Sequence, residues 1–231
     1  MNDAATHAAT DAATHALFDV DGLLLDTERI YTEITQRIVG RYGKTFEWSV
    51  KGNMIGRPSL DAARYLVEAL ALPLRAEDYL AERDALLRAA FPACDALPGA
   101  EALVRHLHRN GVPMAVATSS ARDLYDLKVS RHRGWFDLFD AVVTGDDPAV
   151  ARGKPAPDIF LAAAERIGAP ARATLVFEDS PSGLAAGVAA EMRVIAVPDA
   201  NMDNARYAQA DWIIPSLRAF DPRKYGLAPM E

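Results

Sequence analysis

Two aspartates that could act together, Asp19 and Asp21, lie two residues apart after a short apolar segment and are followed by Gly22. On an extended chain, residues i and i+2 point to the same side, so we expect both carboxylates to face one site. Later apolar segments also lead into polar residues. The second ends in Thr118, Ser119 and Ser120, the third leads through residues 145–147 to Gly153 and Lys154, and the fourth ends in Glu178 and Asp179. If the segments are parallel strands, these groups meet at the carboxyl edge of the sheet, where open α/β folds bind ligands.

Such a site would combine four carboxylates with a lysine, which favours a cation together with a phosphoryl group. Carboxylates ~4 Å apart repel by about 4 kcal/mol per pair at a surface-like dielectric, so a positive charge must hold them. Hard oxygen ligands select Mg²⁺, and phosphoryl transfer mainly requires positioning and neutralisation of charge. The sequence has no G-x-x-x-x-G-K-[ST] loop, because Pro155 follows Lys154, and no G-x-G-x-x-G. Nucleotide-dependent transfer and hydride transfer are therefore disfavoured.

The elements that must position these residues are predicted from apolar runs and helical patterns. Strands are expected at residues 16–20, 113–118, 141–144, 173–177, 193–197 and 212–214. The runs lack clean alternation, which is typical of strands buried on both faces of a parallel sheet. Helical patterns at residues 99–111, 121–129, 158–167 and 180–190 alternate with them, and Ser120 with Asp123 resembles a capping box. This alternation predicts a doubly wound, Rossmann-like α/β fold with a parallel sheet.

Residues 30–96 interrupt the alternation, because they contain helical patterns and no convincing strand. We expect a helical cap there, inserted into an α/β core of residues 15–29 and 97–231. Residues 1–14 form an Ala- and Thr-rich near-repeat without the basic start and apolar run of a secretory signal. We therefore expect a loose N-terminal extension.

Composition excludes several classes of protein. Hydrophobic residues make up 50% of the chain and charged residues 25%, which is the balance of an ordinary globular protein. The net charge of −7 disfavours nucleic-acid binding, and no segment approaches the ~20 apolar residues that span a bilayer. The single cysteine, Cys94, excludes an internal disulfide and fits a reducing compartment. We expect a cytoplasmic monomer without nucleic-acid or membrane partners, acting on a small molecule.

The motifs together resemble a known family. Residues 18–27, Thr118 with Ser119, Lys154 with Pro155, and Glu178 with Asp179 resemble, in this order, the four motifs of the haloacid dehalogenase-like hydrolases. The helical insert after the first motif resembles the cap of the β-phosphoglucomutase-like group, and segments along residues 14–229 resemble the pseudouridine 5′-phosphatases. The resemblance implies an α/β core with a cap and Mg²⁺-dependent hydrolysis of a phosphomonoester, with pseudouridine 5′-phosphate as the expected substrate.

The same resemblance implies a role for each motif residue. Asp19 is expected to attack phosphorus and form an aspartyl-phosphate, and Asp21 to protonate the leaving oxygen and later deprotonate water. Mg²⁺ is expected at Asp19, the backbone carbonyl of Asp21 and Asp179, with Glu178 in support. The phosphate is expected to be bound by Thr118, Lys154, Gly22, Ser119 and Ser120.

Other activities and specificity residues remain open at this stage. Dehalogenation is disfavoured because a departing halide needs no proton from Asp21. In the mutases of the family a histidine follows the first motif, whereas Tyr31 stands in that neighbourhood here, so water is the expected acceptor. A sugar phosphatase, a β-phosphoglucomutase and, more remotely, a non-catalytic binding protein are the alternatives. Arg57 is expected to contact substrate, while Lys128, Arg131 and His132 either recognise the leaving group or form a solvated helix end.

Overall fold

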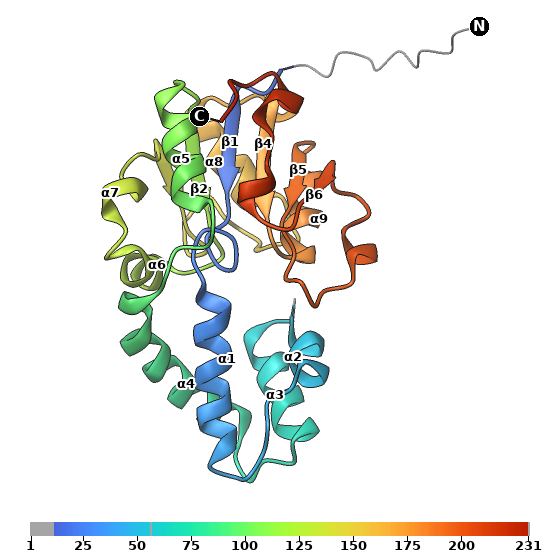
Figure 1. Cartoon of the computed structure of the whole chain (residues 1–231). Coiled ribbons are helices and arrows are strands. Elements are labelled where there is room, and N and C mark those ends of the chain that lie inside the picture. Colours follow the sequence, from blue (N-terminus) through green and yellow to red (C-terminus); the bar gives the residue numbers. More distant parts are fainter. Residues whose placement is uncertain (1–11, 56, 231) are drawn as a thin grey trace, which may run out of the picture.

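The computed structural model describes residues 12–55 and 57–230, which contain a six-stranded parallel sheet (Figure 1). The strands are β1 (His15–Phe18), β2 (Met114–Ala117), β3 (Ala141–Val143), β4 (Thr174–Glu178), β5 (Arg193–Ala196) and β6 (Trp212–Ile213). They follow the order β3-β2-β1-β4-β5-β6, and every neighbouring pair is parallel. This is the strand order of a doubly wound Rossmann-like sheet, so the predicted fold class and all six strands are confirmed.

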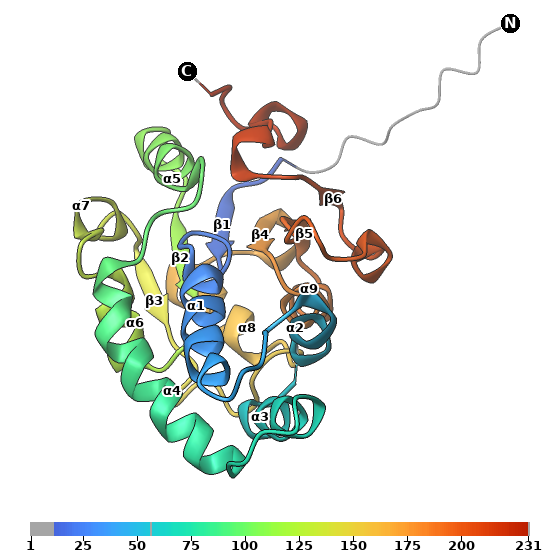
Figure 2. The same ribbon diagram turned by 60° about the horizontal axis from the view of Figure 1, so that its bottom comes forward.

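Alternate residues of the strands face opposite layers of helices. Leu17 and Val176 pack in one apolar cluster with residues of α8 (Asp158–Ile167) and α9 (Pro181–Ala189). Phe18 and Phe177 face the other way, toward α5 (Ala100–Arg109) and the C-terminal segment. Figures 1 and 2 show α5 on one side of the sheet and α8 and α9 on the other. Because both faces are covered, the strands read as continuous apolar runs.

The helix ends follow their local sequence, with one exception. Gly168 ends α8 in the left-handed conformation, and the Ser180 hydroxyl caps α9 by accepting a hydrogen bond from the Gly183 amide at 3.0 Å. The predicted capping box of Ser120 and Asp123 is wrong, because α6 (Arg122–Val129) follows Ala121 and has no side-chain cap. The Ser120 hydroxyl is directed instead at Asp21. The short α7 (Arg133–Phe136) follows α6.

Four helices form a cap below the carboxyl edge of the sheet in Figure 1. They are α1 (Thr27–Gly40), α2 (Trp48–Met54), α3 (Ser59–Ala69) and α4 (Ala76–Ala90), and a 3₁₀ turn (Phe91–Ala93) follows α4. Ile30, Ile34 and Ile38 of α1 are buried at a spacing of four residues and form the apolar face of that helix. Together with Leu66 of α3 and Tyr79 of α4 they belong to the apolar cluster that also covers one face of the sheet.

Two adjacent linkers join the cap to the core. The Asp26 amide donates to the Asp95 carbonyl at 2.8 Å, and the Leu97 amide donates to the Leu24 carbonyl at 2.9 Å. The helices between these linkers begin at Thr27, where Asp26 caps α1 by accepting from the Arg29 amide, and end with the turn at residues 91–93. The helical region therefore starts within the first motif itself.

The predicted N-terminal extension falls mostly on residues 1–11, which lie outside the described residues. Of the rest, Ala13 is buried, and its amide donates to the Tyr225 carbonyl at 2.8 Å. Residues 12–14 are thus attached to the core. Among the described helices none is long and apolar enough to cross a membrane.

Candidate active site

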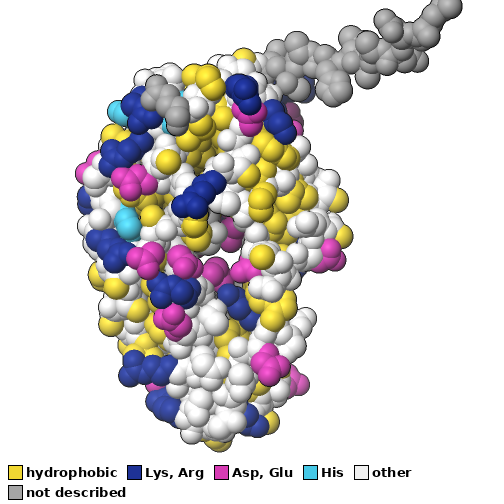
Figure 3. Space-filling view, in the orientation of Figure 1, with side chains coloured by type: hydrophobic (Ala, Val, Ile, Leu, Met, Phe, Trp, Pro, Cys, Tyr) yellow, Lys and Arg dark blue, Asp and Glu magenta, His cyan; other side chains and the backbone are white. Residues whose placement is uncertain are grey.

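The carboxyl ends of β1, β2 and β4 place the motif residues beside the cap. Asp19 follows β1, Thr118 follows β2, and Glu178 ends β4. These strands are neighbours in the sheet, so residues more than a hundred positions apart come together. Between these strand ends and the cap lies a cavity of about 570 Å³, lined by Asp19, Asp21, Ser119, Ser120, Lys154 and Asp179 together with cap residues. Figure 3 shows the surface hollowed at this seam, with acidic side chains gathered along it.

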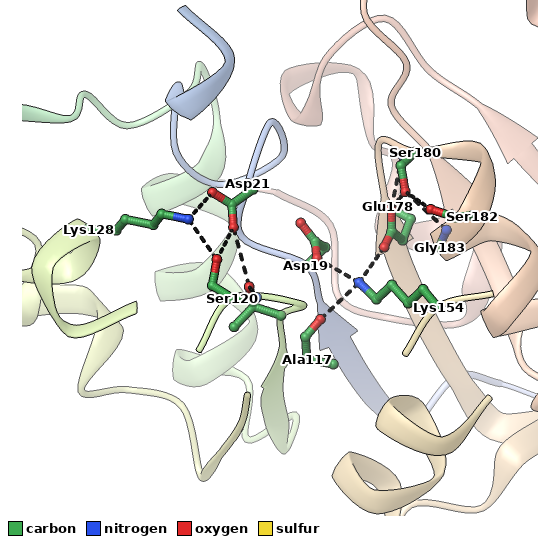
Figure 4. A network of polar contacts seen from close by, with 11 residues as sticks. Asp19, Asp21, Ala117, Ser120, Lys128, Lys154, Glu178, Ser180, Ser182 and Gly183 are labelled. Carbon is green, nitrogen blue, oxygen red and sulfur yellow. Dashed lines mark hydrogen bonds and ion pairs between the residues drawn. The ribbon is translucent and has the colours of Figure 1, made fainter. Parts of the chain in front are cut away.

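Asp19 shares a buried lysine with Glu178. The Lys154 ammonium donates to Asp19 Oδ1 at 2.6 Å, to Glu178 Oε1 at 2.5 Å and to the Ala117 carbonyl at 3.1 Å (Figure 4). Burial, the largest effect, raises the pKa of Asp19 to about 7, although the charge of Lys154 opposes it. Burial disfavours the charged amine of Lys154, but the two carboxylates outweigh it and raise its pKa. The second oxygen of Asp19 makes no hydrogen bond within the described residues.

Glu178 is held from the other side by the start of α9. Its Oε2 accepts from the Ser180 amide at 2.9 Å and from the Ser180 hydroxyl at 3.0 Å. A side chain at Gly183 would collide with this carboxylate, because a Cβ there would lie 1.7 Å from Glu178 Oε1. Both oxygens of Glu178 are thus used to fix Lys154 and α9. Its predicted support of a metal ion stays a prediction.

Asp21 has a lysine of its own. The Lys128 ammonium donates to Asp21 Oδ1 at 2.5 Å, and the Ser120 hydroxyl donates to Asp21 Oδ2 at 2.8 Å. The Thr118 hydroxyl makes a longer contact to the same Oδ2 at 3.4 Å. Burial favours the neutral acid, but the charge of Lys128 and these hydrogen bonds outweigh it and lower the pKa of Asp21. Figure 4 shows the Asp21 carboxylate turned toward Lys128 and away from Lys154.

The sequence left two roles open for Lys128, recognition of the leaving group or a solvated helix end, and did not predict its contact with Asp21. The side chain is 0% exposed, so a solvated helix end is wrong for this residue. A signal was present in the sequence: Tyr125, Lys128 and Val129 share one face of α6 at helical spacing, and the two apolar members are buried. A lysine among core positions of a helix requires a buried partner.

The donor set at Asp19 and Asp179 fits a divalent cation. Burial and the nearby charges of Glu178 and Asp19 raise the pKa of Asp179 well above its usual value. Its carboxylate accepts no hydrogen bond within the described residues, and its Oδ2 is 2.3 Å from where a Cβ of Gly22 would lie. The described residues contain no group of three or more His, Cys, Asp or Glu side chains around one metal position. Mg²⁺ suits such a site, because it is usually bound by one or two carboxylates and completes its octahedron with waters and substrate phosphate.

The remaining predicted residues divide between the cavity wall and the linkers. Arg57 lines the cavity on the cap side, with its guanidinium 4.6 Å above the Tyr65 ring, and Tyr31 lines it from α1. Arg131 instead forms an ion pair with Asp95, and the His132 imidazole is 2.7 Å from the Cys94 carbonyl. These two side chains tie the end of α6 to the linker and do not line the cavity.

Cys94 itself is buried, and burial raises the pKa of its thiol to about 12. A thiol that remains protonated at neutral pH is a poor nucleophile, so the structure assigns it to packing.

Known proteins resemble the chain over nearly its whole length. (DL)-glycerol-3-phosphatase 2 of Arabidopsis thaliana is 47% identical and covers 100% of this chain and 98% of its own. A Drosophila melanogaster protein named "Probable pseudouridine-5'-phosphatase" is 44% identical and covers 93% of this chain and 94% of its own.

Solved structures share the fold of this chain. A HAD family hydrolase from Deinococcus radiodurans with bound phosphate and sodium is 26% identical, has a TM-score of 0.79, and covers 94% of this chain and 99% of its own. A β-phosphoglucomutase from Clostridium difficile, at 18% identity and a TM-score of 0.71, covers 93% of this chain and 97% of its own and shares the fold. The model of the haloacid dehalogenase-like hydrolases matches residues 14–191. By motifs, fold and sequence, the chain belongs to the haloacid dehalogenase-like hydrolase family.

Proposed function

We propose that the chain is a Mg²⁺-dependent phosphomonoester hydrolase that acts through an aspartyl-phosphate on Asp19, with pseudouridine 5′-phosphate as its substrate. One observation carries the proposal. Two carboxylates two residues apart, Asp19 and Asp21, meet on the core side of the cavity between core and cap, and each has a buried lysine as partner. One carboxylate is thereby available to attack phosphorus and the other to exchange a proton.

In the first step Asp19 attacks. Its Oδ1 is held by Lys154, so Oδ2 forms the bond to phosphorus while the bond from phosphorus to the leaving oxygen breaks. Asp21 gives its proton to that oxygen, and an alcohol leaves. The Ser119 and Ser120 segment, which lines the cavity, would bind phosphate oxygens with Thr118 behind it, and Lys154 would neutralise negative charge on both reacting groups.

In the second step Asp21 takes a proton from water, the water oxygen bonds to phosphorus, and the bond to Asp19 Oδ2 breaks. Inorganic phosphate leaves, and both aspartates regain their starting states. A magnesium ion at Asp19, Asp179 and the Asp21 carbonyl would neutralise charge on the transferring phosphoryl group. Closure of the cap over bound substrate would exclude bulk water from the cavity.

The cavity wall supports a substrate with an aromatic base. The volume of about 570 Å³ lies within the range of pockets that enclose molecules much larger than a three-carbon phosphate. Tyr31 and Phe46 line the wall, and aromatic rings of this kind stack on flat ring systems. A second substrate, glycerol 3-phosphate, is favoured by the 47% identity to a glycerol-3-phosphatase.

Two other functions have less support. A mutase needs a sugar hydroxyl as acceptor, and no histidine lines the cavity within the described residues, where Tyr31 stands on α1. A non-catalytic binding protein would have no use for Asp19, Lys154 and Asp179 held together at one site.

We further propose a cytoplasmic monomer. Among the described residues the exposed large hydrophobic side chains are limited to Tyr42, Leu161 and Met230, which are scattered and form no patch for a stable partner. The mass in solution, measured by light scattering, tests the monomer.

The decisive experiment compares phosphate release, with Mg²⁺, from pseudouridine 5′-phosphate, uridine 5′-phosphate, glycerol 3-phosphate and β-glucose 1-phosphate. The Asp19→Asn variant is expected to fold and to show no turnover, whereas Asp137→Asn, at an exposed position directly after α7, serves as the matched control. Reduction of acid-quenched enzyme with borohydride should convert a phosphorylated Asp19 into homoserine, detectable by mass spectrometry. Turnover by Asp19→Asn, or no phosphate from any ester with wild-type protein, would refute the proposal.

A further inference from the structure

A fully buried ammonium group, Lys128, lies where cap and core meet. Its side chain is 0% exposed. On the core side it donates to Asp21 Oδ1 at 2.5 Å and to Ser120 Oγ at 2.6 Å. On the cap side its nitrogen lies 4.5 Å from the centre of the Phe91 ring and 6.0 Å from that of Tyr31. Four groups from four different segments thus enclose one charge.

This enclosure restricts Asp21 to one orientation. A buried ammonium without a carboxylate partner is strongly unfavourable, because ring faces and one hydroxyl do not replace its lost hydration. If the Asp21 side chain rotated away, Lys128 would be left in that state. Ser120 adds a second constraint, since it donates to Asp21 Oδ2 at 2.8 Å and accepts from Lys128. Both carboxylate oxygens are therefore fixed in direction.

The cap supplies part of the same enclosure. Phe91 follows α4 and is 0% exposed, and Tyr31 lies on α1, with the two rings in edge-to-face contact at 5.7 Å. Both residues also line the cavity wall. The position of the Asp21 carboxylate is therefore connected through Lys128 to the aromatic wall that would contact the leaving group.

We propose that Lys128 is a positioning residue for Asp21, holding the carboxylate of the acid–base group at the leaving-group side of the cavity. The inference rests on the proposed function, because it assumes that Asp21 transfers protons in both half-reactions. Lys128 touches neither the phosphoryl group nor Asp19 in this assignment. The alternative is that Lys128 only joins α6 to the cap.

Burst kinetics of Lys128→Met separate the two roles. With 2,4-dinitrophenyl phosphate the leaving phenolate needs no proton, so the variant should release one phenolate per active site rapidly and then turn over slowly. The steady-state kcat should fall about 100-fold or more, the usual contribution of a positioned acid or base, with KM little changed. With glycerol 3-phosphate the burst should be absent, because the alkoxide leaves only with a proton.

Three variants complete the design. Lys128→Arg keeps the charge and should recover part of the kcat that Lys128→Met loses. Ser120→Ala should show the same burst with a smaller loss of kcat. This second variant tests the proposal even if Lys128→Met does not fold. Lys224→Met, whose ammonium lies 3.6 Å above the Trp212 ring on the core surface, is the control and should match wild type.

The outcomes are distinct. Wild-type rates in Lys128→Met, or a burst amplitude and kcat that fall together with the folded fraction, would overturn the positioning role and leave the hydrolase standing. No turnover by wild-type protein on either ester would refute the proposed function, and the positioning role with it.

Discussion

The metal-free protein should become less stable as the pH rises from acid to neutral. Burial raises the pKa of Asp19 from 3.8 to about 7, so between these values the folded state keeps a proton that the unfolded chain has lost. Stability that depends on this proton is complete below about pH 4 and is lost as the pH rises toward about 7. Asp179, whose pKa is also raised, acts in the same direction. The pKa of Asp21 is lowered, so this group makes stability rise with pH, but only at pH values below the ordinary pKa of an aspartate.

The size of the effect follows from the difference between the two pKa values. A difference of about three units at 1.36 kcal/mol per unit corresponds to about 4 kcal/mol for Asp19. One proton gives at most ~1.4 kcal/mol per pH unit, so the slope should approach −1 kcal/mol per pH unit between about pH 5 and about pH 6.5. A single domain of ordinary stability, ~5–15 kcal/mol, would lose a large part of it.

Urea unfolding in EDTA at several pH values from about 5 to about 8 measures this slope, and Asp19→Asn is the matched variant because its amide does not titrate. We expect a flatter profile for Asp19→Asn and, in wild type, recovery of the lost stability at neutral pH when Mg²⁺ replaces EDTA. A flat wild-type profile in EDTA, or an unchanged slope in Asp19→Asn, would show that burial does not hold a proton on this carboxyl.

Two glycine substitutions test the packing of the carboxylates. Gly183→Ala places a Cβ 1.7 Å from Glu178 Oε1 and should push this carboxylate away from Lys154. We expect the free energy of unfolding in urea to fall by about 3–5 kcal/mol and kcat to fall with it. A free energy of unfolding within ~1 kcal/mol of wild type would contradict the close approach. Gly22→Ala combines a φ of +78° with a Cβ 2.3 Å from Asp179 Oδ2, so the Mg²⁺ concentration for half-maximal activity should rise at least ~10-fold. An unchanged Mg²⁺ requirement would separate Asp179 from the metal site.

Much of the fold was predictable because its signals are local. Each strand is a short apolar run, and the first four strands lead into polar residues. The parallel sheet and the meeting of Asp19, Lys154 and Glu178 at its edge therefore follow from chain order and strand direction. Ser180 was also predictable as the cap of α9, since its hydroxyl satisfies a free amide of that helix.

Ser120 and Lys128 were harder, because their partners come from elsewhere in the chain. Ser120 has the right type and spacing to cap α6. Its hydroxyl instead donates a hydrogen bond to Asp21, which lies ninety-nine residues away in the sequence. A hydrogen bond from a hydroxyl to an ionised carboxylate is stronger than the neutral hydrogen bond of a helix cap. Lys128 has the same difficulty: its surroundings come from residues 21, 31, 91 and 120, and no local pattern contains that set. Only the position of Lys128 on the buried face of α6 indicated that its side chain is directed into the protein.

Asp19 and Asp21, the two aspartates that we propose to react, show that the surroundings of a carboxyl decide its protonation, and not its position in the sequence. Asp19 and Asp21 are neighbours in sequence, yet burial raises the pKa of Asp19 to about 7 and Lys128 helps to lower that of Asp21. In the proposed reaction the needs are reversed, since the nucleophile must be ionised and the acid must carry a proton. A cation beside Asp179 would favour the ionised form of Asp19, and the negative charge of a bound phosphate ester would favour the protonated form of Asp21. Near neutral pH the metal-free protein is therefore expected to hold only part of its Asp19 in the ionised form and to keep Asp21 ionised, and metal and substrate would shift both groups toward the states that the proposed hydrolysis needs.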